Sequence, residues 1–326
     1  MAISCRVTRG ELTESIHVAF AVVVDKNRQV VFSTGDPNYL TCIRSSLKPF
    51  QAAAAIKAGA VDSAKFNDEE IALMCASHQG EKMHTDTAQS MLKKLGLTVK
   101  DYGCGAHDPS DKSTRDNLIL AQIPASPLHN NCSGKHAGML ALANQLGVRI
   151  SGYTKFDHPV QKFINDYVSK IAEVQDLHCQ TDGCSAPTPF FTLETIAKMF
   201  QKLASGHKVE LKRVFNAMAS HPLMVGGSDN FDSNFIKVLK GRGITKVGGE
   251  SIRGISIKTE EYGPVGIAIK VLDGNFRALP IATIKLLDHL DILNDKEKDQ
   301  LSCYGTRILK NHNNLETGKI EAYIDF

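Results

Sequence analysis

The stretch Arg44-Ser45-Ser46-Leu47-Lys48-Pro49-Phe50-Gln51, which runs into Ala52-Ala53-Ala54-Ala55-Ile56, is the one around which the rest of the chain is organised. A helix is expected to begin near its middle. Positions three apart on a helix share a face, so we expect Ser45 and Lys48 to lie side by side. After Gln51 nearly every residue is alanine, which is typical of a buried helix. Lysine is seldom buried without a partner, so a lysine leading this helix requires a physical reason.

A serine and a lysine at this spacing form a catalytic pair in one class of enzymes. Serine alone is a poor nucleophile. A neighbouring lysine becomes a usable base when burial or another cation lowers its pKa, and the serine then attacks a carbonyl carbon. The penicillin-recognising enzymes use this S-x-x-K arrangement. Both residue types are common, and many such pairs are solvated surface pairs, so the motif alone leaves both interpretations open.

Length and composition limit the classes of protein to which this chain can belong. The 326 residues suffice for one large domain or two. A net charge of +3 gives no reason to expect nucleic acid or a membrane surface as a partner. The N-terminus lacks a long apolar segment, and no run approaches a membrane-spanning helix, so we expect a cytoplasmic protein. The eight cysteines include no C-x-x-C pair and are expected to be reduced thiols.

The two ends of the chain carry strand signals. Residues 16–25 and 29–33 are predicted to form a hairpin. Near the C-terminus, 265–271 and 275–278 flank Asp273-Gly274, a strong two-residue hairpin signal, so a second hairpin is predicted there. A helix near 280–292, one further helix and a polar tail should follow. The pattern predicts one antiparallel sheet assembled from both chain ends, with helices packed on it.

The middle of the chain is predicted to be helical. Asn67 is expected to cap a helix whose first turn is acidic. Further helices are expected at 83–96, 135–146, 157–174, 190–203, 208–219 and 231–240.

Three loops rich in glycine and cysteine are candidates for a site. Residues 75–81 place polar side chains after an apolar helix, as a site rim or an ordinary helix end would. In 130–138, Ser133-Gly134-Lys135 is expected to open a helix, without the spacing of a nucleotide-binding P-loop. In 180–189, Cys184 follows Asp182, and a meeting of Cys184 with Cys132 would allow zinc binding. Lys246 lies in a fourth, glycine-flanked segment, where a surface position is the simpler interpretation.

Taken together, these motifs resemble the class 3, Rhizobium etli type of L-asparaginase, the asparaginase II family. The resemblance runs through most of the chain and is less clear beyond about residue 280. The matching blocks, in the family's order, are Thr8-Arg9-Gly10, Glu14-Ser15, Arg44-Ser45-x-x-Lys48-Pro49, Ala72-Leu73-Met74-Cys75-Ala76-Ser77-His78, Asn131-Cys132-Ser133-Gly134-Lys135-His136, Asp157-His158-Pro159 and Thr181-Asp182-Gly183-Cys184.

The resemblance implies a fold, a site and an assembly. The fold is α/β (α+β), an antiparallel sheet flanked by helices as in serine β-lactamases and glutaminases, in a single catalytic domain over residues 1–326. Two serine–lysine tandems are implied, and members of the family are commonly homodimers. The tandems fall on Ser45 with Lys48 and on Ser77 with Lys246, and the zinc ligands fall on Cys132, Lys135 and Cys184.

The reaction implied is hydrolysis of the side-chain amide of L-asparagine through an acyl-enzyme, with Ser45 as nucleophile and Lys48 as its base. Two ammonium groups in one pocket lower each other's pKa, which predicts an alkaline activity optimum. Arg44 is expected to bind the substrate carboxylate, unless it pairs with a nearby acid. Asp182 or Glu14 would meet the ammonium group, and His136 is a further expected substrate contact.

Three alternatives remain open. The first is a glutaminase or another small-amide hydrolase on the same fold. The second is a β-lactamase-like acyl transferase, which is disfavoured because its K-T-G motif is absent. The third is a non-catalytic zinc-binding protein in which the two cysteines are structural.

Overall fold

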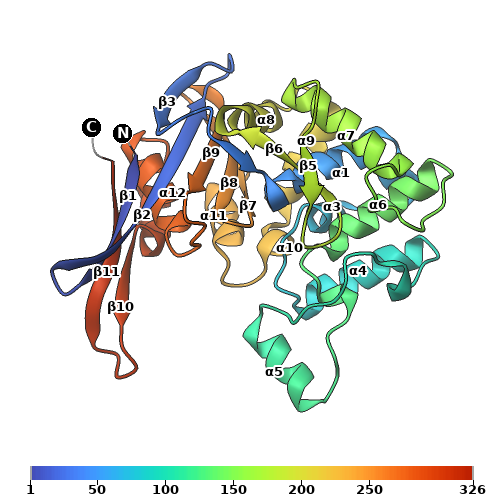
Figure 1. Ribbon diagram of the computed structural model, residues 1–326, viewed down its shortest axis with the longest axis horizontal. Helices are drawn as coiled ribbons and strands as arrows, with labels where there is room; N and C mark the ends of the chain where they lie inside the picture. Colours follow the sequence, from blue (N-terminus) through green and yellow to red (C-terminus); the bar gives the residue numbers. More distant parts are fainter. Residues whose placement is uncertain (1, 325–326) are drawn as a thin grey trace. The chain divides into compact units, whose positions relative to one another are not determined.

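The computed structural model describes residues 2–324 and shows a mixed α/β protein that divides into two compact units (Figure 1). The first, here called the sheet unit, contains the residues up to Ser46, Phe191–Ser205 and those from Val238 onward. The second, the helical unit, contains Leu47–Phe190 and Gly206–Lys237. The expectation of a single catalytic domain stays a prediction.

The sheet unit is built on an antiparallel sheet of eight strands in the order β10-β11-β1-β2-β9-β8-β7, with β3 paired to β2. Strand β1 lies between β2 and β11, so the two chain ends meet in one sheet, as predicted. The strands are β1 (Ile3–Arg9), β2 (Leu12–Val24), β3 (Val30–Thr34), β7 (Gly243–Gly248), β8 (Ile252–Thr259), β9 (Gly263–Val271), β10 (Thr306–Lys310) and β11 (Glu316–Ile324). A short strand, β4 (Leu40–Cys42), precedes the 3-10 helix η1 (Arg44–Leu47).

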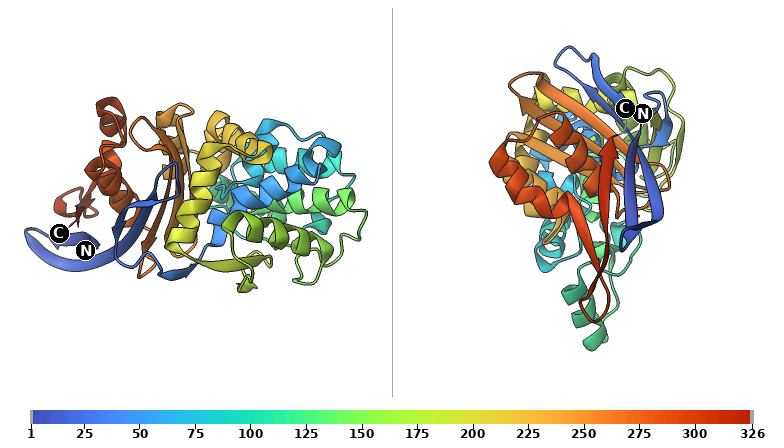
Figure 2. Two further views of the ribbon diagram at one scale, coloured as in Figure 1. Left: turned by 90° about the horizontal axis from the view of Figure 1, so that it is seen from above. Right: turned by 90° about the vertical axis from the view of Figure 1, so that its left-hand side faces the viewer.

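Helices cover both faces of this sheet (Figure 2). Helix α8 (Leu193–Ser205) packs on β2, β8 and β9, while α12 (Leu279–His289) packs on β1, β9 and β11. Two glycines let α8 approach closely. A Cβ atom at Gly266 would lie 2.0 Å from the Ala197 carbonyl oxygen, and one at Gly254 would lie 2.0 Å from the Phe200 ring. Helix α13 (Asp295–Leu301) and the 3-10 helix η4 (Ser302–Tyr304) complete this unit.

The helical unit is centred on α1 (Lys48–Lys57), whose residues are buried from Lys48 to Ile56. The run of alanines lets α6, α7 and α9 pack directly on it. The remaining elements are α2 (Ala60–Ser63), α3 (Asp68–Met74), α4 (Lys82–Lys94), η2 (Val99–Asp101), α5 (Lys112–Leu120), η3 (Pro127–His129), α6 (Ser133–Gln145), α7 (Pro159–Ala172), β5 (Cys179–Thr181), β6 (Pro187–Thr192), α9 (Val209–Ser220), α10 (Pro222–Gly226) and α11 (Phe231–Leu239).

Most predicted elements are confirmed. The N-terminal hairpin is β2 paired with β3, and Asn67 caps α3 in a capping box with Glu70. All eight cysteines are free thiols. No helix in residues 2–324 is long and apolar enough to cross a membrane.

Two predictions for the C-terminal third are wrong. The hairpin at Asp273-Gly274 does not form, because the Asp273 side chain accepts from Asn275 N and the Asn275 side chain accepts from Arg277 N. These turns lead into α12 instead, and β9 pairs with β2 and β8. The expected polar tail is two strands, β10 and β11, whose hydrogen bonds to each other and to β1 order a segment of weak apolar pattern.

Candidate active site

Lys48 is the first residue of α1 and is 1% exposed. Its Nζ atom donates to the carbonyl oxygens of Ala76 and Asn131, at 2.5 and 3.1 Å, and to Ser77 Oγ at 3.1 Å. An ammonium group has three hydrogens for these three acceptors. A neutral amine has only two, and if the two carbonyls take them its lone pair faces the Ser77 hydroxyl. The same geometry therefore serves both protonation states of a lysine base.

Ser77 lies in the loop Ala76–Glu81 that follows α3. Its amide donates to the Val225 carbonyl at 3.0 Å, and the Gln79 carbonyl accepts from the Asp111 amide at 3.1 Å. Together with the Lys48 contact to Ala76, these bonds tie the loop to three other segments of the helical unit. The loop is thus a rigid support for the Ser77 hydroxyl.

His78, the next residue, is a buried imidazole with both nitrogens engaged. The Gly80 amide donates to Nδ1 at 3.1 Å, so Nε2 carries the proton and donates to Ser133 Oγ at 2.9 Å. Burial, with His84 and Lys48 nearby, holds the pKa of His78 well below its ordinary value. A base for Ser133 would need an unprotonated Nε2. This tautomer therefore excludes Ser133 as a nucleophile activated by His78.

Cys132, Lys135 and Cys184 converge in the helical unit. Lys135 Nζ lies 2.8 Å from Cys184 Sγ, and the Cys184 thiol is hydrogen-bonded to Cys132. That bond, with the ammonium groups of Lys48 and Lys135, holds the pKa of Cys132 well below its ordinary value. Burial opposes charge on Lys135, but Cys132 and Cys184 raise its pKa above the ordinary value. The cluster thus brings two cysteine sulfurs and the Lys135 amine together, and the Cys132 sulfur also lies 3.0 Å from Asn131 Oδ1.

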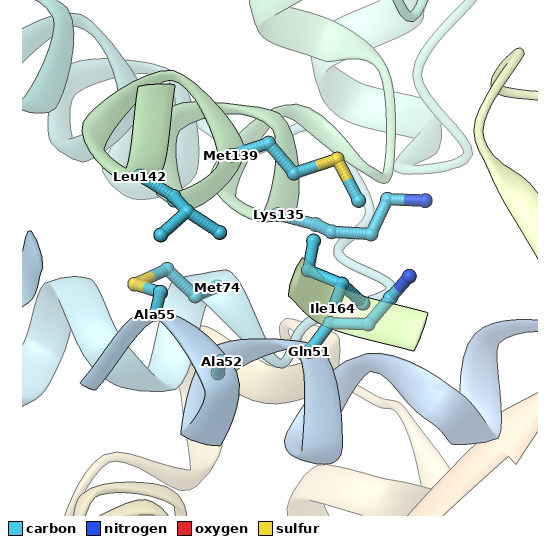
Figure 3. Close-up of a pocket in the computed structure, with 9 residues that line it drawn as sticks. Gln51, Ala52, Ala55, Met74, Lys135, Met139, Leu142 and Ile164 are labelled. Atoms are coloured by element: carbon cyan, nitrogen blue, oxygen red, sulfur yellow. The ribbon is translucent and has the colours of Figure 1, made fainter. Parts of the chain in front are cut away.

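Packing fixes the stem of Lys135. A cavity of about 10 Å³ lies between α1, α3, α6 and α7, lined by Lys135, Gln51 and apolar side chains that include Met139 and Ile164 (Figure 3). That volume holds at most about one water molecule. Lys135 extends from α6 and Gln51 from α1, and both side chains line the cavity (Figure 3). The aliphatic part of the Lys135 side chain therefore has little freedom to move, and its amine stays beside the thiols.

His136, the residue after Lys135, is fully buried beside Tyr153. The Tyr153 hydroxyl accepts from the Gly103 amide at 2.8 Å and lies 2.6 Å from His136 Nδ1, to which it donates. Burial, then the charges of Lys135 and Lys48, lower the pKa of His136 well below its ordinary value. Nε2 of His136 has no hydrogen-bond partner among the described residues. A substrate contact by His136 would have to use that atom.

The sheet unit places η1 beside the end of β7. Ser46 Oγ donates to the Lys246 carbonyl at 2.8 Å. The Arg44 guanidinium packs over Gly249, where a Cβ atom would lie 2.9 Å from its Cζ. The Lys246 side chain is fully buried, and its Nζ donates to the Val247 carbonyl at 2.7 Å. The segment that carries Ser45 therefore lies against the strand that carries Lys246.

One family model matches nearly the whole chain, over residues 5–322, and its description is L-asparaginase II. The chain belongs to the L-asparaginase II family. Membership in the L-asparaginase II family identifies the protein as an enzyme, an amidohydrolase. The match also covers the C-terminal region beyond residue 280, where the sequence resemblance was less clear.

Solved structures similar to this L-asparaginase II family member include β-lactamases. One from Francisella tularensis is 12% identical, with 79% of this chain and 84% of that chain covered and a TM-score of 0.38. A double mutant of the chromosome-encoded β-lactamase of Vibrio parahaemolyticus is 14% identical, with 89% and 92% covered and a TM-score of 0.39. Likeness at this level says nothing of substrate. A search of the curated proteins found no significant match.

The predicted site residues of this amidohydrolase fall into two groups. The helical unit brings Lys48 to Ser77, and Lys135 to the two cysteines. Asp182 accepts from the Gly183 amide, and its charge acts on Lys135. His136 also lies in the helical unit, and the sheet unit holds Arg44, Ser45 and Lys246.

Two further predicted features have a definite position. Glu14, the other candidate for the substrate ammonium, forms an exposed ion pair with Arg9 at 3.0 Å. No group of three or more His, Cys, Asp or Glu residues suited to a metal occurs in residues 2–324, so a zinc site would need Lys135 as a ligand.

One motif and several hydrogen-bond partners of the site residues were not predicted from the sequence. Ser228-Asp229-Asn230 is an S-D-N tripeptide, so the β-lactamase-like alternative is disfavoured by the missing K-T-G alone. Its serine is engaged, because Glu81 accepts from the Ser228 amide and hydroxyl at 2.7 and 2.9 Å. The pairing of His78 with Ser133 was also missed, although both residues stood inside the quoted motifs. The carbonyls that bind Lys48 carry no sequence signal at all.

Proposed function

We propose that this amidohydrolase hydrolyses the side-chain amide of L-asparagine to L-aspartate and ammonia with a serine–lysine mechanism. The observation that supports it is the contact of Lys48 Nζ with Ser77 Oγ in a buried, carbonyl-lined position. Two carbonyls orient the amine of Lys48 beside the serine hydroxyl, and an uncharged amine in that place can accept a serine proton. Family membership supplies the reaction class.

In the proposed mechanism, Ser45 Oγ forms a bond to the amide carbon while its proton passes to Lys48. The C–N bond of the tetrahedral intermediate then breaks, and ammonia leaves with the returned proton. Water attacks the aspartyl ester and loses its proton by the same route, which releases aspartate and restores the serine. Ser77 and Lys246 complete the proton relay. Arg44 binds the substrate carboxylate, Asp182 its ammonium group, and His136 donates from Nε2.

The donor set at Cys132, Lys135 and Cys184 fits zinc, which prefers thiolate and nitrogen ligands and leaves one position open when the protein supplies three. When bound, the metal supplies a fixed positive charge for substrate binding. Zinc would displace the protons that the two cysteines and Lys135 carry, so binding should strengthen as the pH rises.

Addition of zinc to metal-free protein in weak buffer tests this part of the proposal. The wild type is expected to bind one zinc per chain and to release protons as it does so. Cys184→Ser and Lys135→Met are expected to bind no zinc and to release no protons. Cys303→Ser, an exposed thiol, is the control. Wild-type proton release from Lys135→Met would contradict the ligand assignment.

The decisive experiment on the reaction measures ammonia release from L-asparagine and L-glutamine by wild type, Ser45→Ala and Ser77→Ala. Release from asparagine in preference to glutamine is expected, with loss of turnover in Ser45→Ala. Rapid acid quench and mass spectrometry should find the aspartyl adduct on the peptide that contains Ser45. An adduct on Ser77 would reverse the serine roles, and faster turnover of glutamine would make the protein a glutaminase.

Covalent labelling by a β-lactam would favour the acyl transferase alternative. Bound zinc without ammonia release from any amide would favour the binding protein. The proposal includes a homodimer, which light scattering of the purified protein tests.

A further inference from the structure

The imidazole of His78 occupies a central place in the loop that carries Ser77. It is 1% exposed, and it connects two segments that are far apart in the sequence. Nδ1 accepts from Gly80 within the loop, and Nε2 donates to Ser133 at the start of α6. The ring therefore ties the Ser77 loop to the helix that also carries Lys135.

The other side of the ring is packed against a second histidine. His78 and His84 are stacked with ring centroids 4.8 Å apart and an interplanar angle of 15°. His84 Nε2 donates to the Leu223 carbonyl at 3.0 Å, just before the segment whose Val225 carbonyl binds the Ser77 amide. Burial lowers the pKa of His84, which favours the uncharged form of the ring stacked on His78. Rotation of His78 is blocked on this face.

The direction of the Ser77 side chain depends on this arrangement. Ser77 Oγ meets Lys48 at 3.1 Å, close to the upper limit of a useful hydrogen bond. A loop displaced by even 1 Å would break that contact, and misplacement on this scale lowers rates by up to about 10²-fold. His78 is the residue next to Ser77, and it bonds at both ring nitrogens.

We propose that His78 is a positioning residue that holds the Ser77 hydroxyl against Lys48 through its bond to Ser133. The inference rests on the proposed serine–lysine function. His78 neither touches the reacting atoms nor exchanges protons during turnover; it fixes the loop geometry in which Lys48 and Ser77 meet.

Substitution of His78 by two amide side chains distinguishes the hydrogen bond at Nδ1 from the hydrogen bond at Nε2. His78→Gln can keep a donor near the position of Nε2, while His78→Asn reaches only the position of Nδ1. We expect His78→Gln to retain kcat within about threefold, and His78→Asn to lose kcat by about 10- to 100-fold with little change in KM. Ser133→Ala should lose kcat to a similar extent, and the double variant His78→Asn/Ser133→Ala should be no worse than His78→Asn alone.

His158 provides a matched control in the same unit. Its Nδ1 accepts from Val160, two residues ahead, and its Nε2 donates to the Arg149 carbonyl, the same pattern as in His78. His158→Asn should leave kcat unchanged. An equal loss of kcat in His158→Asn and His78→Asn would indicate general destabilisation and overturn the proposal.

A spectroscopic measurement tests the geometry without activity. In ¹⁵N-labelled protein at neutral pH, His78 should show the neutral Nε2–H tautomer, because the Gly80 amide donates to Nδ1 and burial holds the pKa of His78 well below its ordinary value. A protonated His78 or an Nδ1–H tautomer at neutral pH would overturn the proposal.

The failure of this inference is distinguishable from failure of the proposed function. Wild-type kcat in folded Ser133→Ala, or in folded His78→Asn, would overturn the role of His78 while the reaction stands. If His78→Asn does not fold, Ser133→Ala decides, because it removes the acceptor and leaves the histidine in place. A wild-type protein that releases ammonia from no amide would remove the proposed function itself.

Discussion

Two regions of the molecule hold their buried residues by different means. In the sheet unit, α8 lies close on the strands because Gly254 and Gly266 leave room for its ring and backbone atoms. In the helical unit, two lysines and three histidines are buried and are held by hydrogen bonds to carbonyls, a thiol and hydroxyls. The sheet unit also buries charge, because Lys246 and Lys270 are held by backbone carbonyls. Shape therefore decides the packing of α8 on the strands, and satisfaction of polar groups decides how the buried charges are held.

The largest effect is expected from Lys48→Met, which removes the amine and leaves the Ala76 and Asn131 carbonyls without their donor. Ammonia release from asparagine should fall by about 10²- to 10⁴-fold, the range for loss of a general base. Lys57→Met, at the exposed far end of α1, is the control. Wild-type turnover in Lys48→Met would show that the buried amine of Lys48 has a structural role and is not the catalytic base.

Gly266→Ala tests the sheet unit. The new methyl group would lie 2.0 Å from a backbone carbonyl of α8, which cannot move without displacing the helix. Unfolding free energy should fall by about 3 kcal/mol, at the upper end for overpacked cores. Gly305→Ala, whose nearest neighbour would lie at 3.4 Å, should change it little. Equal denaturant midpoints for both variants would refute close packing as the basis of this unit.

Tyr153→Phe tests satisfaction of polar groups in the helical unit. It removes the hydroxyl that accepts from the Gly103 amide and donates to His136 Nδ1, and it leaves the buried His136 nitrogen without this donor. A loss of about 1–3 kcal/mol in unfolding free energy is expected, measured by urea unfolding. Tyr102→Phe, which removes one long bond of 3.5 Å, should cost less. A larger loss of unfolding free energy in Tyr102→Phe than in Tyr153→Phe would mean that packing, not hydrogen bonding, determines stability in the helical unit too.

The smallest effect is expected at Asp273, a half-exposed carboxylate in the sheet unit that lies 2.5 Å from His17. Burial opposes the shift, but the hydrogen bond from His17 holds the pKa of Asp273 below its ordinary value. The contribution of Asp273 to the unfolding free energy is therefore present above the pKa of this carboxyl in the unfolded chain. It is lost as the pH falls through the lower pKa of the folded protein. Asp273→Asn should lower stability by less than about 1 kcal/mol at pH 7, after solvent screening. The difference from wild type should vanish near pH 2; a difference that grows on acidification would contradict the sign.

The sequence predicted the elements with strong local patterns. The alanine-rich helix after Lys48, the helix opened by Ser133 and the hairpin of β2 and β3 all follow from periodicity and capping. The predicted hairpin at Asp273-Gly274 failed because side chains of Asp273 and Asn275 can close their own turns, which competes with strand pairing. Strands β10 and β11 were missed because their order depends on pairing with β1, from the other end of the chain.

For the candidate site, the sequence could nominate residues but not their hydrogen-bond partners. The structure brings Cys132, Lys135 and Cys184 together, and their role as zinc ligands stays a prediction. The acceptors of Lys48 include two main-chain carbonyls, which any residue can supply. The tautomer of His78 is set by an amide of Gly80, again a backbone group. Such partners leave no trace in side-chain chemistry and are visible only in three dimensions.

The pairing of β1 with β11 also governs how the protein is made. Strand β1 leaves the ribosome long before its neighbour on one side, Glu316–Ile324. Leu47–Phe190 and Gly206–Lys237 are both synthesised in the interval between the two strands. Domains tend to fold during synthesis as their residues emerge. The nascent chain therefore carries an unpaired edge of β1 until β11 emerges, and an unpaired strand edge is a site for pairing with other chains.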